Sequence, residues 1–326
     1  MNADSLTAHS DGIKMTDSFG REITYMRISV TDLCNLRCRY CMPAEGVVKK
    51  NHDDIMSEDE IINAIEAASE LGISKIRFTG GEPLVKKNIV SICRRTSEIH
   101  GIKEICITTN GILLPNFADS LRLAGVERVN ISLDTLRPER YSYITRGGSL
   151  NDAVKGIESA IRTGFRVKIN SVIIGGFNDD EISGLAGLTM NDDIDIRFIE
   201  LMPMTETVTA GNFVASRKIL DVLPDIEPLE SDGVAEMYRL KNARGRIGFI
   251  SPVSDSFCQK CNRIRLTADG YLKPCLHSAA EIFIRHKSRE EIKSLITEAI
   301  ISKPERHMLN ENSHTDSLRT MNRIGG

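Results

Sequence analysis

The 326-residue sequence predicts an α/β protein built as a partial (β/α)6 barrel. Short β-branched runs alternate with amphipathic stretches at six places, which indicates repeated βαβ units with parallel strands. Polar residues follow the carboxyl ends of these runs and would line one rim, as in a barrel, whereas a doubly wound sheet binds ligands at a switch point. Six units fall short of a full barrel of eight, so we expect an incomplete TIM-type barrel.

The elements of this alternation follow one another closely along the chain. A strand is expected at 25–30. Ser57 to Glu60 form a capping box that begins a helix, whose apolar face includes Ile61 and Ile65 and which ends at Gly72. Further strands are expected at 75–79, 104–108, 128–133, 166–174 and 195–199, and helices near 86–98, 115–124, 150–163 and 179–189.

Polar residues occur where the expected strands end. Cysteines follow the first strand, Gly80-Gly81-Glu82-Pro83 the second, and Thr108 to Gly111 the third; Ser132, Asp134, Asn170 and Glu200 to Met202 follow later ones. Function in such sheets lies on the loops after the strands, so we expect one shared site. Gly80 and Gly81 alone would fit a simple tight turn equally well. Beside a cysteine loop, their missing side chains let the backbone approach a ligand closely.

The strongest motif is formed by Cys34, Cys38 and Cys41, with the spacing C-x3-C-x2-C. A ferredoxin holds its 4Fe-4S cluster with four thiolates, so three local ones leave an iron open to another ligand, as catalysis at a metal requires. Tyr40 adds an aromatic face beside the third cysteine. Separate buried thiols, a structural zinc site and a disulfide framework are the alternatives. Clustering argues against the first, and zinc sites usually have a fourth ligand.

The composition argues against nucleic-acid and membrane partners. Lysine and arginine number 42 against 45 acidic residues, a net charge of −3, and tryptophan is absent, so neither a basic field nor stacking platforms are indicated. No stretch approaches 18 apolar residues and residues 1–20 are polar, which predicts a cytoplasmic chain. In that reducing compartment, clustered cysteines indicate metal binding, whereas the isolated Cys93 and Cys106 are expected in the core.

The first cysteine motif, with its aromatic residue before the third cysteine, resembles that of the radical S-adenosylmethionine enzymes. The resemblance implies the partial barrel, and a 4Fe-4S cluster on Cys34, Cys38 and Cys41 whose open iron binds the methionine moiety of S-adenosylmethionine. It further implies that this cosubstrate is contacted at the matching positions Tyr40, Gly81, Ser132 and Met202. Without the resemblance, Met202 would be interpreted as a core residue.

A second cysteine set, Cys258, Cys261 and Cys275, follows a linker and a loosely patterned segment at 203–235. Its spacing, C-x2-C-x13-C, fits either a second cluster with an open iron or half a zinc ribbon completed by His277. Arg263 and Arg265 stand two residues apart in a β-like run, so both leave the same face of a strand. They are either a solvated pair or a binding site for an anion such as a triphosphate, which arginine forks suit.

The two cysteine sets, the arginine pair and the terminal Gly325-Gly326 together resemble the GTP 3′,8-cyclase family of molybdenum cofactor biosynthesis, over residues 20–326. The resemblance implies a second 4Fe-4S cluster on Cys258, Cys261 and Cys275 whose open iron binds guanine. It implies GTP contacts at Arg27, Arg77, Thr108, Lys168, Arg263 and Arg265, with Arg197 in the same basic lining. The Gly-Gly tail is expected to reach toward the active site.

The reaction that the resemblance implies begins with one-electron cleavage of S-adenosylmethionine to methionine and a 5′-deoxyadenosyl radical. This radical takes the 3′ hydrogen from the ribose of GTP, and C3′ bonds to C8 to give (8S)-3′,8-cyclo-7,8-dihydro-GTP, the first step of molybdopterin biosynthesis. Expected partners are an electron donor such as flavodoxin or ferredoxin, and cyclic pyranopterin monophosphate synthase, which consumes the product. The resemblance leaves a homodimer open.

The expected domain organisation is a flexible N-terminal tail at 1–20, the radical barrel at 21–202, and a smaller C-terminal region at 203–326 that closes the barrel and carries the second cluster. Two other functions remain open. One is a radical S-adenosylmethionine enzyme with an auxiliary cluster that acts on a peptide. The other is a non-enzymatic iron–sulfur or zinc-stabilised binding module, in which Arg263→Ala would leave the activity intact.

Overall fold

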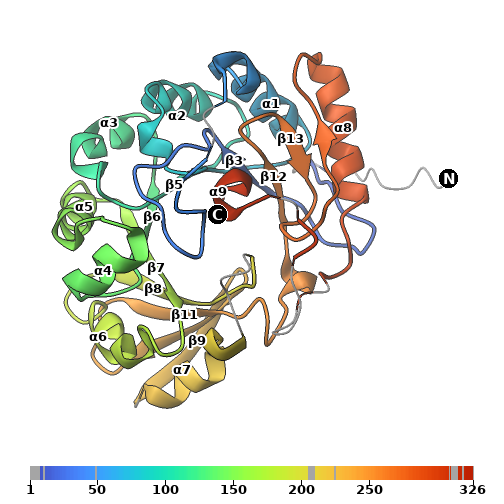
Figure 1. Ribbon diagram of the computed structural model, residues 1–326. Coiled ribbons are helices and arrows are strands. Elements are labelled where there is room, and N and C mark those ends of the chain that lie inside the picture. The colour runs from blue at the N-terminus through green and yellow to red at the C-terminus, as the bar shows by residue number, and fades with distance from the viewer. Residues whose placement is uncertain are drawn as a thin grey trace.

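The protein is organised around one large, mostly parallel sheet (Figure 1). The computed structural model describes residues 8–9, 12–47, 50–204, 210–223, 225–307, 309, 315–317 and 319–325. The strands within these residues are β1 (Ala8–His9), β2 (Gly12–Ile13), β3 (Tyr25–Ser29), β4 (Lys75–Thr79), β5 (Glu104–Thr109), β6 (Arg128–Ser132), β7 (Arg166–Ile173), β8 (Ile194–Glu200), β9 (Ile226–Asp232), β10 (Ala235–Leu240), β11 (Arg246–Ile250), β12 (Arg263–Leu266), β13 (Tyr271–Lys273) and β14 (Ile282–Phe283). Twelve of them form the large sheet, in the order β14-β13-β12-β3-β4-β5-β6-β7-β8-β11-β10-β9.

The predicted six-strand parallel core is confirmed. Strands β3 to β8 lie side by side in chain order, and each pairs in parallel with the next. Every strand end falls within one residue of the expected position. The alternation of apolar and polar residues located these strands because one face packs on helices while the other lines the interior of the sheet.

The C-terminal region adds a parallel strand at each side of this core, which the sequence analysis did not predict. β11 pairs in parallel with β8, and β12 pairs in parallel with β3. Neither β11 nor β12 belongs to the regular alternation of strand and helix from which the first six strands were predicted. The outermost strands β14 and β9 are not hydrogen-bonded to one another in the described sheet, so the parallel strands form an incomplete ring, as Figure 1 shows.

The helices lie mainly on the outside of the curved sheet (Figure 1). They are α1 (Glu58–Glu70), α2 (Ile89–Ser97), α3 (Ala118–Leu123), α4 (Pro138–Thr145), α5 (Leu150–Arg162), α6 (Ile182–Gly187), α7 (Ser216–Val222), α8 (Arg289–Ile301) and α9 (Met321–Ile324). Short 3-10 helices are η1 (His52–Asp54), η2 (Pro83–Val85), η3 (Leu114–Asn116), η4 (Asp179–Glu181), η5 (Ala210–Asn212) and η6 (Cys258–Lys260). The exception is α9, which lies in the central space that the strands surround.

The expected helices of the first six units are present, and α1 begins with the predicted capping box. The backbone N–H of Glu60 donates to Ser57 Oγ at 3.2 Å, and the backbone N–H of Ser57 donates to Glu60 Oε2 at 2.8 Å. Two of the expected helices start with a 3-10 turn, η3 before α3 and η4 before α6. The short helix α4, which starts at Pro138, was not predicted.

The hydrophobic core lies between the sheet and its outer helices. Ile61 and Ile65 of α1 are fully buried there, as the helical period predicted. Cys93 and Cys106 are also fully buried, which confirms them as core residues. Among the described residues, no helix is long and apolar enough to cross a bilayer.

The interpretation of 203–235 as a linker with a loosely patterned segment was wrong for its second half, because α7 and β9 form there. β9 is an edge strand that pairs only with β10 in the described sheet, and its side chains are exposed or half-buried. An edge strand with two polar faces lacks the alternation that identifies half-buried strands.

Candidate active site

A cavity of about 410 Å³ opens at the carboxyl ends of the parallel strands. The cavity is lined by every residue that the sequence analysis assigned to a cluster, to the cosubstrate or to GTP. These residues are Cys34, Cys38, Cys41, Cys258, Cys261, Cys275, Tyr40, Gly81, Ser132, Met202, Arg27, Arg77, Thr108, Lys168, Arg197, Arg263 and Arg265. The structure therefore brings these residues together around one space. Their individual roles stay predictions.

The first cysteine triad lies on the loop after β3. Within it, the backbone N–H of Leu36 donates to Cys34 Sγ at 3.3 Å, and the N–H of Cys41 donates to the carbonyl of Cys38 at 2.9 Å. All three cysteines are free thiols. Burial raises the pKa of Cys34 to about 11, that of Cys41 to about 12, and that of Cys38 well above its usual value. A bound cation would reverse this, because positive charge stabilises thiolates.

Two glycines let the loop after β4 pack tightly against the cysteine loop. A Cβ at Gly81 would lie 2.3 Å from the carbonyl oxygen of Leu33, and one at Gly80 would lie 2.3 Å from that of Thr31. Gly80 also has a φ of +138°, which favours glycine. Both positions therefore require glycine for packing as well as for any approach to a ligand.

Glu82 follows these glycines and is enclosed by protein groups. Its side chain is 1% exposed and accepts hydrogen bonds from Thr109 Oγ1 at 2.7 Å and from the backbone N–H of Asn110 at 2.8 Å and of Leu84 at 3.1 Å. Burial raises the pKa of Glu82 to about 7. The carboxylate thus fixes the loops after β4 and β5 to each other, and backbone carbonyls remain the better candidates for an ammonium ligand in this loop.

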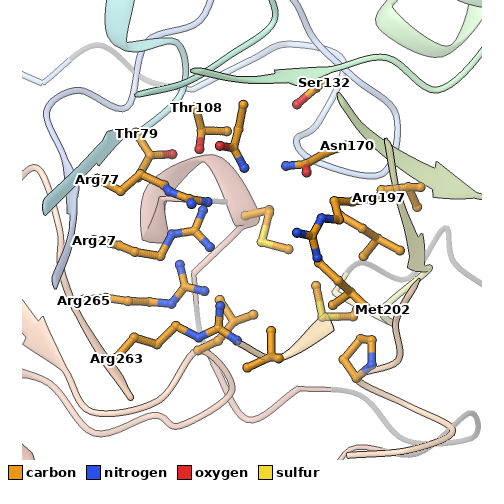
Figure 2. Close-up of a pocket in the computed structure, with 18 of the residues that line it drawn as sticks. Arg27, Arg77, Thr79, Thr108, Ser132, Asn170, Arg197, Met202, Arg263 and Arg265 are labelled. Atoms are coloured by element: carbon orange, nitrogen blue, oxygen red, sulfur yellow. The ribbon is translucent and has the colours of Figure 1, made fainter. Parts of the chain in front are cut away.

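Tyr40 connects the cysteine loop to the far side of the cavity. Its hydroxyl donates to Asp134 Oδ2 at 2.7 Å, while Asp134 Oδ1 accepts the backbone N–H of Val172 at 2.9 Å. Burial raises the pKa of Asp134 to about 6. Ser132, Asn170 and Met202 face the same space (Figure 2).

One wall of the cavity carries a ladder of arginines. Arg265 of β12, Arg27 of β3 and Arg77 of β4 occupy the same level on three adjacent parallel strands. Figure 2 shows these three and Arg263 with their guanidinium groups directed to the middle of the cavity. Burial lowers the pKa of Arg265 to about 10, with Arg263 acting in the same direction. Burial and then Arg265 lower the pKa of Arg27 well below its usual value.

On the opposite wall, the cations Lys168 and Arg197 share two acids, the half-exposed Asp232 and the buried Asp195, whose Oδ2 lies 3.5 Å from Lys168 Nζ and 3.7 Å from Arg197 Nη2. Asp232 Oδ2, at the end of β9, lies 2.5 Å from Lys168 Nζ and 2.6 Å from Arg197 Nη2. Burial raises the pKa of Asp232, but hydrogen bonding and attraction from Lys168, with attraction from Arg197, outweigh this and hold it well below its usual range. Burial, and then repulsion from Arg197, lower the pKa of Lys168 to about 8.

Several polar atoms of these walls have no hydrogen-bond partner among the described residues. They include the side-chain atoms Arg77 Nε, Arg128 Nε, Arg197 Nε, Thr108 Oγ1, Asn130 Oδ1 and Tyr25 Oη, and all of these are buried. Their residues line the cavity. Buried polar groups in folded proteins nearly always have partners, and although a few described groups elsewhere also lack one, the number gathered around this cavity favours a polar ligand that supplies them.

The second triad is at the mouth next to β12. Cys258 lies in η6, Cys261 follows it, and Cys275 follows β13. Burial raises the pKa of Cys261, but Arg263 and Lys303 outweigh it and lower the pKa to about 6. For Cys258, burial is likewise outweighed, chiefly by a hydrogen bond from His307, and the pKa falls to about 7.

The C-terminal helix α9 reaches the same cavity. Arg265 Nη1 donates to the carbonyls of Gly325 at 2.9 Å and Ile324 at 3.4 Å. Asn322 Nδ2 donates to the carbonyl of Asp32 at 3.1 Å, and Asn322 and Met321 contribute to the cavity wall. Gly325, with a φ of +76°, ends the helix. Gly326 lies outside the described residues.

Comparisons with known proteins agree with this geometry. Residues 28–188 match the Radical SAM superfamily, and residues 194–309 match Molybdenum Cofactor Synthesis C. The chain is 50% identical to GTP 3′,8-cyclase of Alkaliphilus oremlandii and 48% identical to that of Alkaliphilus metalliredigens, each over 320 residues, with 96% of this chain and 100% of the relative covered. The chain belongs to the GTP 3′,8-cyclase family.

Solved structures that resemble this GTP 3′,8-cyclase family member support its fold. The crystal structure of Streptococcus suis SuiB gives a TM-score of 0.64 at 14% identity, covering 88% of this chain and 68% of that chain. At so low an identity the likeness concerns the fold alone. The family matches and the relatives confirm the predicted family and its enzymatic nature, and the structural likeness confirms the α/β class.

The residues of both triads fit the clusters that the family implies. Six reduced cysteines line the cavity in two groups of three. Within the described part of the chain, no three His, Cys, Asp or Glu side chains converge on a point where one metal ion would bind. In a 4Fe-4S cluster each cysteine binds a different iron, so its ligands stand further apart than those of a single ion.

Sequence reasoning missed several charged or polar residues of the cavity, among them Tyr25, Lys75, Arg128, Asp232, Lys303 and His307. Tyr25 and Lys75 stand two positions before Arg27 and Arg77 on the same strands, so the period of two placed them on the same face. Asp232 had no such signal, because it is at the end of an edge strand that lacks a clear pattern.

Proposed function

We propose that this protein is a GTP 3′,8-cyclase, which converts GTP into (8S)-3′,8-cyclo-7,8-dihydro-GTP in the first step of molybdopterin biosynthesis. The observation that carries the proposal is the convergence of two cysteine triads and two cationic walls on one cavity. The relatives of similar length that carry the name GTP 3′,8-cyclase support the choice of substrate. No observation favours the peptide-modifying alternative.

The two triads would hold two 4Fe-4S clusters, Cys34, Cys38 and Cys41 the first and Cys258, Cys261 and Cys275 the second. Tyr40, Gly81, Ser132 and Met202 would contact S-adenosylmethionine. When bound there, the first cluster and S-adenosylmethionine supply the 5′-deoxyadenosyl radical that takes the 3′ hydrogen of GTP before C3′ bonds to C8. Tyr40 is held in place for its contact by the hydrogen bond to Asp134.

The protein's own part is to bind and orient GTP. The ladder Arg265, Arg27 and Arg77 presents three guanidinium groups at one level, and Lys168 and Arg197 face it across the cavity. A guanidinium group can donate two parallel hydrogen bonds to a pair of phosphate oxygens. The burial that lowers the pKa of Arg27 and Arg265 is a free-energy penalty in the empty site, and a triphosphate relieves it. Arg263 and Thr108 complete the substrate contacts that we assign.

The partners follow from the reaction. Reductive cleavage consumes one electron, so a reduced donor such as flavodoxin or ferredoxin must reach the first cluster. The cyclic product still carries its triphosphate, and cyclic pyranopterin monophosphate synthase would consume it. We place the enzyme in the cytoplasm, where a reducing environment keeps the six site cysteines available as thiolates. A homodimer stays a prediction.

The proposal is tested by anaerobic turnover of the reconstituted protein with S-adenosylmethionine and a strong reductant, following 5′-deoxyadenosine with GTP and with ATP. We expect GTP alone to stimulate its formation. Arg265→Ala should reduce this stimulation by roughly ten-fold or more, because a charge-assisted contact is lost. Arg166→Ala, at an exposed position of β7 paired with Glu127, is the matched control and should behave as wild type.

Two results would contradict the proposal. If 5′-deoxyadenosine forms at one slow rate with GTP, with ATP and without nucleotide, the substrate is not GTP. If no 5′-deoxyadenosine forms although both clusters are loaded, the radical chemistry itself is absent.

A further inference from the structure

Tyr25 lies deeper in the cavity than the arginine ladder. On β3 it stands two residues before Arg27, and it is paired across the sheet with Arg263 of β12 and Lys75 of β4. Its side chain lines the cavity and the residue is 6% exposed. Tyr25 thus occupies the level directly below Arg265, Arg27 and Arg77 on the same inner face of the sheet.

The ring of Tyr25 is held by two cations of the neighbouring strand. Lys75 Nζ lies 5.3 Å from the ring centroid, and Arg77 Cζ lies 5.4 Å from it. Both distances are within the range of cation–π contacts. The ring therefore has a fixed position, and with it the hydroxyl group at its end.

The hydroxyl of Tyr25 has no hydrogen-bond partner among the described residues, although it is buried. Its surroundings are cationic, since Tyr25 interacts electrostatically with Arg27, Arg128, Arg263 and Arg265. Guanidinium groups are donors only, so none of them can accept the phenolic proton. Glu104, on the adjacent strand β5, pairs with Lys75 at 2.7 Å and with Arg128 at 2.6 Å.

A buried O–H donor surrounded by cations needs an acceptor that is itself an anion. The ligand of this cavity that brings such an acceptor is a phosphate group, whose oxygens accept hydrogen bonds from hydroxyl and guanidinium groups alike. Ribose and guanine are less suitable, because a neutral acceptor would leave the positive charge around the hydroxyl uncompensated.

We propose that Tyr25 is a substrate-binding residue of the cyclase and that its hydroxyl donates a hydrogen bond to a phosphate oxygen of the GTP triphosphate. This inference rests on the proposed function. It extends the triphosphate site from the two cationic walls to the floor of the cavity, which Tyr25 and Lys75 form below the arginine ladder.

The test is Tyr25→Phe, which removes only the hydroxyl and keeps the ring between its cations. Binding of GTP, guanosine and inorganic triphosphate is measured by equilibrium dialysis on the anaerobic, cluster-loaded protein. We expect roughly ten-fold to a hundred-fold weaker binding of GTP and of inorganic triphosphate, since a hydrogen bond to a charged group is lost. Guanosine, which has no phosphate, should bind as it does to wild type.

Tyr141→Phe is the matched control. Tyr141 is 2% exposed and its hydroxyl also lacks a partner in the described structure, but the residue is not among those that line the cavity. Its GTP affinity should equal that of wild type. The iron content and thermal midpoint of both variants establish that the fold and the clusters are intact.

The possible results separate the inference from the function on which it rests. If Tyr25→Phe loses as much affinity for guanosine as for GTP, or loses no affinity for GTP, the role of the hydroxyl is overturned while the cyclase proposal stands. Wild-type protein that binds inorganic triphosphate but prefers no guanine nucleotide over ATP overturns the cyclase proposal instead. A loss of affinity for GTP and inorganic triphosphate, with unchanged affinity for guanosine, supports the inference.

Discussion

Removing the charge of Asp232 should strengthen GTP binding. In the structure this carboxylate bridges Lys168 and Arg197, the two cations to which we assign the triphosphate on that wall. The cations are buried, with side chains 11% and 4% exposed, whereas the Asp232 side chain is 41% exposed. An incoming phosphate must therefore displace the carboxylate or share both cations with it.

The expected size follows from Coulomb's law with a correction for solvent. A pair of unit charges about 4 Å apart interacts by about 4 kcal/mol at an effective dielectric constant of 20. Because Asp232 is partly in water, measured values for such exposed partners are far smaller, about 1 kcal/mol per pair. Asp232→Asn removes two such competing pairs, about 2 kcal/mol together, so we expect GTP to bind roughly thirty-fold tighter.

The assay is the dissociation constant of GTP at pH 6.5, by equilibrium dialysis of the cluster-loaded protein. This pH lies below the pKa of about 8 of Lys168, so the lysine stays charged in wild type. Asp180→Asn is the matched control, because Asp180 also bridges two cations, Arg137 and Arg140, at an exposed site. Its GTP affinity should not change. Weaker GTP binding by Asp232→Asn would refute the competition and make Asp232 a contributor to substrate binding.

Three further outcomes follow from single side chains. Lys168 loses its proton as the pH rises through about 8, so GTP affinity should fall above that pH in wild type but not in Lys168→Arg. The dissociation constants of both proteins, measured from pH 7 to 10, test this. Glu200 Oε2 accepts the backbone N–H groups of Val253 at 3.0 Å and Ser254 at 2.9 Å, and Glu200→Gln would place an amide donor against them. The substitution should cost about 1–3 kcal/mol of stability and lower the iron content of the second triad, which thermal melting and iron analysis measure. Gly81→Ala, whose Cβ would lie 2.3 Å from the carbonyl oxygen of Leu33, should displace the cysteine loop and weaken S-adenosylmethionine binding at least ten-fold; unchanged binding would show that the loop adapts.

The strand core and the first triad could be predicted because their signals are local. Strand β4 carries its alternation within five residues, and Cys34 to Cys41 lie on one loop, so neither depends on distant parts of the chain. The same holds for the capping box of Ser57 and Glu60. Such features are determined by residues that are neighbours in the sequence, and the structure places them where the sequence indicated.

The edges of the sheet could not be predicted because their partners are distant. β12 pairs with β3 across more than 230 residues, and β11 pairs with β8 although α7 and the strands β9 and β10 lie between them in the chain. The arginine ladder depends on this pairing. Arg263 and Arg265 could be assigned to one strand face from their spacing, but only the register of β12 against β3 puts Arg265 level with Arg27 and Arg77.

The charge balance of the cavity is the part that sequence reasoning reaches least. The whole chain has a net charge of −3, yet the described cavity gathers arginines and lysines from at least five strands, with Glu104, Asp195 and Asp232 as partial counterions. Concentrating buried cations lowers the pKa of Arg27 and Arg265 and opposes folding. An anion that binds among these cations offsets the free-energy cost of burying them. The same residues that lower the stability of the protein without substrate therefore supply the affinity for a triphosphate. Asp232 limits that affinity by occupying Lys168 and Arg197 in the free protein, and a partly exposed acid at the end of an edge strand is well suited to be displaced.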